Sequence, residues 1–193
     1  MTGRNTPNCP PIGAPAVGEV VWFDADGREL KRHSFGQYLY SCRLATLRQG
    51  EEPKLIVTDG EGFAWLFSRQ LEVERKVRIT CGTAGRFLTP VLETVADLDG
   101  DGKQELVFLS HEEELVSGNN PGRAGDPPTI RHTHNLRLLV RDSRLRPVAD
   151  HLLAQHVPAI PNLTIWAGPL AEGKPCQILV LGEQVLVFEL TSR

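Results

Sequence analysis

The chain repeats itself, and this internal repeat is the sequence feature that most constrains its fold. Residues 42–57 align without a gap on residues 93–108, at an offset of 51 residues. Apolar residues recur at matched positions, which are Ala45 and Ala96, Leu47 and Leu98, Leu55 and Leu106, Ile56 and Val107, and Val57 and Phe108. A third copy runs from residues 163–167 to residues 178–181, with one extra residue in its loop. Two short apolar runs joined by a polar loop predict a β-hairpin in each copy.

A second repeated unit alternates with the first. Residues 21–30 match residues 64–73 and 138–147, and residues 185–188 begin a fourth copy. Trp22 and Trp65 stand at equivalent positions, where we expect them to pack between neighbouring units. Four strands in each period of about 40 to 50 residues are typical of a β-propeller. The sequence therefore predicts an all-β, propeller-like fold of about three to four blades, each a four-stranded antiparallel sheet.

The number of units leaves the expected ring incomplete. The chain should open on an outer strand pair, continue through two complete four-stranded units, and end after an inner pair and one outer strand. Closed propellers use about four to eight blades, so this chain is expected to form part of a propeller or a small distorted ring. Because unpaired edge strands favour association, we expect a protein partner, or self-association, through the open blade edges.

Two segments stand apart from the repeats. Residues 1–18 carry four prolines and three glycines, and we expect them to form a flexible tail. Residues 19–193 should form the propeller-like module, with a long polar loop at residues 111–134.

One loop carries a pattern suited to a metal ion. Between residues 97 and 105 three aspartates alternate with other residues, a glutamate follows, and two glycines stand between them. Calcium takes about six to eight oxygen ligands, and glycine lets the backbone turn tightly enough to bring several carboxylates to one point. Oxygen-only ligands disfavour zinc and copper. The predicted Ca²⁺ ligands are the side chains of Asp97, Asp99, Asp101 and Glu105 and the backbone carbonyl of Lys103. The matched positions in the earlier repeat are Thr46, Arg48, Gly50 and Lys54, so only this copy has the acidic set.

An EF-hand loop shares the first acidic positions but requires a glutamate at its twelfth position, where this chain has Phe108. Residues 106–109 are a short apolar run typical of a strand. The carboxylate at the ninth position and the strand that follows resemble the FG-GAP/VCBS repeat of integrin-like β-propellers. That resemblance covers about ten residues of one repeat. It implies that the loop joins the first two strands of a blade and that its aspartates bind calcium.

The resemblance implies a noncatalytic calcium-binding module that acts as a protein-interaction or assembly subunit. Two alternatives remain open, a carbohydrate-binding or polysaccharide-lyase-associated propeller and a cytosolic scaffold subunit. Aromatic residues make up 6% of the chain, fewer than clustered sugar-stacking platforms would need.

Other polar clusters are weaker candidates. The chain lacks the sequence motifs of P-loop, dinucleotide-binding and HExxH proteins, so we expect no catalytic activity. The acidic run Glu112, Glu113 and Glu114 could hold a carboxylate pair but is expected to be solvated. His132 and His134 would share one face of a strand and could join His111 on a transition metal.

Composition excludes several function classes. Lys and Arg total 21 against 24 Asp and Glu, giving a net charge of -3, so no nucleic-acid-binding surface is expected. No apolar run reaches the roughly 18 to 20 residues that span a bilayer. The first residues lack the apolar segment of a signal peptide, which predicts a cytoplasmic location unless a leader has been removed. Four widely separated cysteines, Cys9, Cys42, Cys81 and Cys176, are expected to be reduced and mostly buried.

Overall fold

The protein folds into stacked antiparallel sheets. The computed structural model describes residues 2–4, 18–84, 86–115, 131–157, 163–170, 176–182 and 185–189. These residues form fourteen strands and no helix, which confirms the predicted all-β class. Accordingly, the described residues provide no helix that could span a membrane.

Each sheet is a meander in which consecutive strands pair in chain order. The first sheet contains β1 (Thr2–Arg4), β2 (Gly18–Phe23) and β3 (Glu29–Phe35), and the second contains β4 (Leu39–Ala45), β5 (Lys54–Asp59), β6 (Phe63–Phe67) and β7 (Val73–Arg78). The third contains β8 (Phe87–Ala96), β9 (Glu105–Leu115), β10 (Arg131–Arg141) and β11 (Pro147–Val157), and the fourth contains β12 (Thr164–Pro169), β13 (Cys176–Leu181) and β14 (Val185–Glu189). This division into a strand pair, two four-stranded units and a final three strands agrees with the predicted repeats, with β1 added at the N-terminal edge.

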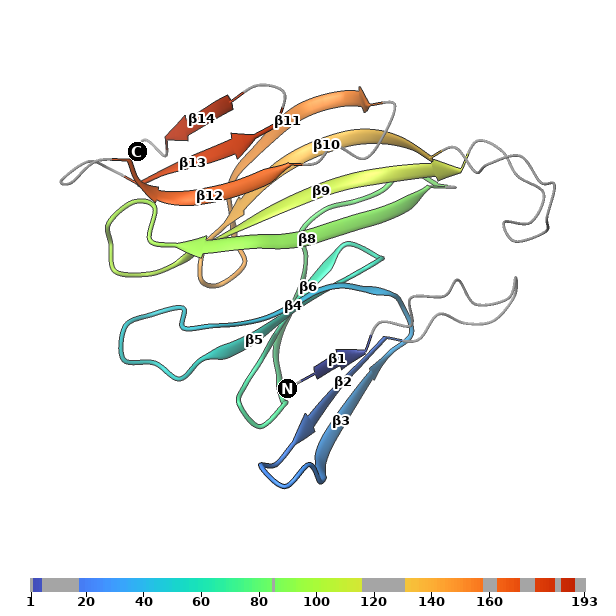
Figure 1. Ribbon diagram of the computed structural model, residues 1–193, viewed down its shortest axis with the longest axis vertical. Helices are drawn as coiled ribbons and strands as arrows, with labels where there is room; N and C mark the ends of the chain where they lie inside the picture. Colours follow the sequence, from blue (N-terminus) through green and yellow to red (C-terminus); the bar gives the residue numbers. More distant parts are fainter. Residues whose placement is uncertain are drawn as a thin grey trace.

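Three apolar cores hold the sheets together in the same order. One core lies between the first and second sheets, a second between the second and third, and a third between the third and fourth (Figure 1). On β9, Leu106 and Phe108 face the second sheet, whereas Val107 between them faces the fourth. Both faces of the middle sheets are therefore buried, which explains why residues 55–57 of β5 and residues 106–109 of β9 are continuous apolar runs.

The first two copies of the first repeat form the predicted hairpins, and they pair in the same register. Ala45 pairs with Lys54 on β4 and β5, and Ala96 pairs with Glu105 on β8 and β9, which are the same positions at the offset of the alignment. Trp22 and Trp65 pack as expected against the core between the first two sheets, where the ring of Trp65 lies 5.2 Å from that of Phe35.

The three copies of the second repeated unit have the same turn. In each copy the side chain of the first turn residue, Asp24, Ser68 or Asp142, accepts hydrogen bonds from the backbone N–H groups two and four residues later. The fourth residue has a left-handed backbone in all three copies, with φ of 81° at Gly27, 58° at Leu71 and 60° at Leu145. The three hairpins therefore close in the same way although their turn sequences differ.

Four expectations need correction. Glu112 and Glu113 of the acidic run are buried, contrary to the expected solvation. Thr2–Arg4, inside the expected tail, forms β1 and pairs with β2. The polar segment at 111–134 is largely strand at its two ends, because Glu114 pairs with His132 and Glu112 with His134; residues 116–130 lie outside the described residues. Backbone pairing continues there without apolar side chains, which the hydrophobic pattern could not reveal. Cys42 and Cys81 are exposed, contrary to the expected burial.

Candidate metal centre

The predicted metal loop connects β8 to β9 and brings three carboxylates together. One oxygen from each of Asp97, Asp99 and Glu105 lies within 4.8 Å of the others. Among the described residues this is the one group of three or more His, Cys, Asp or Glu side chains that meets so closely. Asp99 is exposed and Glu105 is buried, so the cluster reaches from the surface to the edge of the core.

The backbone of the loop is shaped by its own carboxylates. The N–H groups of Gly100 and Gly102 donate to the two carboxylate oxygens of Asp97 at 2.8 and 2.9 Å. Both glycines have a left-handed backbone, with φ of 79° and 80°, a conformation that costs other residues about 1 to 2 kcal/mol. The alternating glycines are therefore required by the loop geometry, as the sequence pattern indicated.

Glu105 lies at the buried end of the cluster, and its side chain has 5% of its surface exposed. Its Oε2 accepts a hydrogen bond of 2.8 Å from the backbone N–H of Leu98, a loop residue that packs in the core between the third and fourth sheets. Burial raises the pKa of the Glu105 carboxyl, and the negative charges of Asp99, Asp101 and Asp97 add to this although the Leu98 hydrogen bond opposes it. Without a cation, this carboxylate is thus held in an unfavourable electrostatic environment.

Asp101 and Lys103 depart from the predicted ligand set. The Asp101 carboxylate forms an ion pair with the Lys103 ammonium group and accepts a 2.8 Å hydrogen bond from the Lys103 backbone. These hydrogen bonds, the side-chain one first, lower the pKa of Asp101. The structure therefore brings together three of the four predicted side-chain ligands, while Asp101 is paired with Lys103. The backbone of Lys103 forms an isolated bridge to Arg48.

The loop lies against the equivalent loop of the second sheet. The Gln104 N–H donates to the Leu47 carbonyl at 2.9 Å, next to the bridge between Arg48 and Lys103. Arg48 aligns with Asp99 in the repeat, so one loop offers a cation where the other offers a ligand. A pocket of about 350 Å³ opens beside the carboxylates and is lined by residues of both loops and of the β10–β11 turn. This pocket gives water access to the loop.

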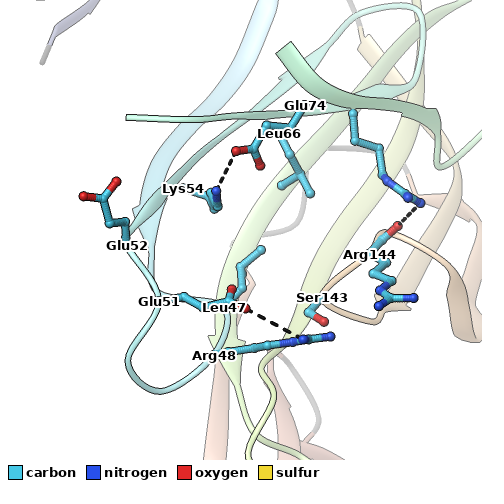
Figure 2. A pocket seen from close by; sticks show the side chains of 10 residues that line it. Leu47, Arg48, Glu51, Glu52, Lys54, Leu66, Glu74, Ser143 and Arg144 are labelled. Atoms are coloured by element: carbon cyan, nitrogen blue, oxygen red, sulfur yellow. Dashed lines mark hydrogen bonds and ion pairs between the residues drawn. The ribbon is translucent and has the colours of Figure 1, made fainter. Parts of the chain in front are cut away.

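A second pocket, of about 520 Å³, lies next to the first, and Figure 2 shows the residues that line it. Its charges are compensated locally. Lys54 contacts Glu74 at 2.6 Å and Arg48 contacts Glu51 at 3.7 Å. Arg75 of β7 donates to the carbonyl of Arg144 in the β10–β11 turn at 3.0 Å, which links the second sheet to the third. These contacts explain the pocket as a polar junction between two sheets.

The sequence pattern did not predict one neighbour of the metal loop, Cys176 of β13. Burial raises the pKa of the Cys176 thiol on β13, and the negative charges of Asp97 and Glu105 raise it further. Cys176 is remote from the loop in sequence and reaches it because the fourth sheet packs on the third. The position of Arg48 beside the metal loop, by contrast, could have been expected from the sequence, because the repeat alignment matches Arg48 with Asp99.

Comparisons with protein-family models, with curated proteins and with solved structures found no match to this chain. The assignment of a function therefore rests on the residues and their geometry.

Proposed function

We propose that the protein is a noncatalytic calcium-binding module of FG-GAP/VCBS-like, propeller-like architecture, which serves as an interaction or assembly subunit. The observation that carries the proposal is the convergence of Asp97, Asp99 and Glu105 within 4.8 Å on a loop with two left-handed glycines.

The chemistry of the loop favours calcium over zinc or copper. Its side-chain donors are carboxylate oxygens, which suit hard cations and not zinc or copper. Oxygens on opposite sides of a calcium ion lie about 5 Å apart, so three oxygens that all lie within 4.8 Å of one another can share one such ion. Rotation of Asp101 away from Lys103 would add the fourth predicted carboxylate, and water from the adjoining pocket would complete the coordination.

The proposed role of the ion is structural. Binding would neutralise the mutual repulsion of the carboxylates and connect the ends of β8 and β9. Because Leu98 anchors the same loop in the core between the third and fourth sheets, a bound ion would also stabilise their packing. Such binding stabilises the folded state by mass action, by about 2.7 kcal/mol at a calcium concentration 100 times the dissociation constant.

Calorimetric titration of the metal-free protein, together with thermal unfolding in EDTA and in calcium, tests this proposal. We expect one calcium ion per chain and a higher melting temperature in calcium, and we expect Asp99→Asn to weaken binding at least tenfold. Asp26→Asn is the matched control, because it removes an exposed aspartate from a turn of the first sheet. Absence of both binding heat and thermal stabilisation in the unmodified protein would contradict the proposal.

The acidic run on β9 supports a noncatalytic role. Glu112 accepts hydrogen bonds from Arg86 and Asn135, and Glu114 contacts Arg86 at 3.3 Å. Glu113 contacts His111 at 3.1 Å. Each carboxylate thus has a structural partner, and alternation along the strand directs Glu113 to the face opposite Glu112 and Glu114.

The exposed face of the fourth sheet supports the assembly role. The register of β12, β13 and β14 places Trp166, Leu179, Leu181, Val185 and Val187 on one face. Trp166 is 40% exposed, Val185 62% and Val187 51%. By contrast, Ile178 and Val180 on the opposite face are buried against the third sheet. We therefore assign the association surface to the outer face of the fourth sheet, where a further β-sheet would pack in a propeller.

A further inference from the structure

A second cluster of potential metal ligands lies at the other end of the third sheet. The carboxylate loop precedes Glu105 at the start of β9, whereas this cluster adjoins Glu114 near the end of the strand. Nine residues of strand separate the two positions by roughly 30 Å. The cluster is thus independent of the proposed calcium centre.

Three adjacent strands contribute to the cluster. His132 and His134 alternate on β10 with ring centroids 6.4 Å apart. His156 on β11 is the register partner of His134, and its ring centroid lies 4.9 Å from that of His134 and 5.2 Å from that of His132. Glu114 on β9 pairs with His132, and its Oε2 lies 3.0 Å from Nε2 of His134. Four side chains that can bind a transition metal therefore meet on one face of the sheet.

These separations match those of a tetrahedral site. Zinc binds histidine nitrogen at about 2.0 to 2.1 Å, so donor atoms around one ion lie about 3.4 Å apart and the ring centroids about 5 Å apart. Two of the three centroid distances, and the contact between Glu114 and His134, are close to these values. No three donor atoms of these four side chains lie within 4.8 Å of one another in the present rotamers. His156 is exposed, so its ring can rotate toward the other two.

The environment of His134 is a second indication. Its Nε2 is buried, lies 3.0 Å from Oε2 of Glu114, and forms no hydrogen bond with the described residues. A buried polar atom that forms no hydrogen bond destabilises the folded state, and a metal bond would satisfy this nitrogen. Arg86 contacts Glu114 at 3.3 Å and would orient it as an outer-shell partner.

We propose that His132, His134, His156 and Glu114 bind a divalent transition-metal ion, with zinc as the preferred ion. Imidazole nitrogen suits zinc, copper and nickel, whereas calcium and magnesium prefer oxygen ligands. The two ends of the third sheet would then hold ions of different chemistry.

Titration of the metal-free protein with zinc chloride, in calcium sufficient to fill any carboxylate site, tests the proposal. We expect one zinc ion per chain, and a loss of at least tenfold in affinity for His134→Ala and for His156→Ala. Cobalt substitution adds a readout of geometry, because tetrahedral cobalt(II) absorbs far more strongly in the visible range than octahedral cobalt(II).

Two control variants make the outcome specific. His151→Ala removes another histidine of β11, one whose ring packs on Phe188 at 4.9 Å, and should leave zinc affinity unchanged. Glu105→Gln alters the carboxylate loop and should also leave it unchanged. His156 is exposed, so His156→Ala should fold normally. The absence of stoichiometric zinc binding, or equal effects of His156→Ala and His151→Ala, would overturn the proposal.

Discussion

At the scale of single residues, Glu105 shows how the fold places a carboxylate where its charge is costly. The side chain is buried, three aspartates surround it, and both effects raise its pKa, burial first. Between the unfolded and the folded pKa, the folded metal-free protein binds more protons than the unfolded chain does. The contribution of Glu105 to stability therefore falls as pH rises through this window, which begins at the ordinary glutamate pKa of 4.5.

Glu105→Gln should remove this pH dependence, because glutamine keeps an oxygen for the Leu98 N–H but carries no charge. In EDTA we expect the stability of the variant, relative to the unmodified protein, to increase as pH rises above about 4.5. In calcium at 100 times the dissociation constant, the unmodified protein should instead be the more stable of the two, because it gains about 2.7 kcal/mol that the variant lacks. Urea unfolding across pH measures both effects. A relative stability that stays constant with pH in EDTA would contradict this account.

At the scale of elements, the shared five-residue turn shows how different sequences close the same hairpin. Gly27 takes the left-handed backbone without strain, whereas Leu71 and Leu145 take it at a cost of about 1 to 2 kcal/mol each. Both leucines are fully buried in the cores between sheets. Burial of a leucine stabilises the fold by about 1.5 to 3 kcal/mol, which offsets the strain.

Leu145→Ala and Leu145→Gly separate these two effects. Both variants should lose about 2 to 5 kcal/mol of stability because they remove a buried leucine side chain. Alanine keeps the left-handed strain but glycine relieves it, so we expect the glycine variant to be the more stable by about 1 kcal/mol. Chemical denaturation gives the comparison.

Leu139 is the matched control, because it lies in the same core but in β10, where ordinary strand geometry applies. At this position the Leu139→Ala variant should be more stable than the Leu139→Gly variant by about 0.5 to 1 kcal/mol. The same order at both positions would show that the strain at Leu145 is negligible.

At the scale of the whole molecule, the two outer faces of the stack differ. The first sheet turns polar side chains outward, and Arg32 forms ion pairs there with Glu19 and Glu29. The fourth sheet turns apolar side chains outward, including Val187 and Trp166. Association through the fourth sheet would remove this apolar surface from water and stabilise the complex by roughly 25 cal/mol per Å² buried.

Val187→Asp should weaken self-association by at least tenfold, because it places a charge within the exposed apolar face. Sedimentation velocity at increasing concentration measures the effect. Leu30→Asp is the control, since Leu30 is a similarly exposed apolar residue on β3 and lies in the first sheet. A strictly monomeric unmodified protein, or equal effects of the two variants, would contradict self-association through this face.

Local patterns were sufficient to predict much of this architecture. The offset repeat predicted the hairpins, because strand pairing across a short loop depends on residues close in sequence. The acidic loop was likewise recognisable, since its glycines and aspartates shape their own backbone. The continuation of β9 and β10 into the polar segment was not predictable, because backbone pairing there proceeds without an apolar pattern.

Only the tertiary structure decided which side chains meet. It brings Arg48 and Cys176 to the metal loop, and it buries Ile178 while exposing Val187. It also brings His156 beside His134 through the register of β10 and β11, which a bulge shifts along the strands. These contacts depend on how sheets stack and on where bulges shift a register. Both are set by packing between segments that are distant in the chain, and no local pattern of residues encodes them.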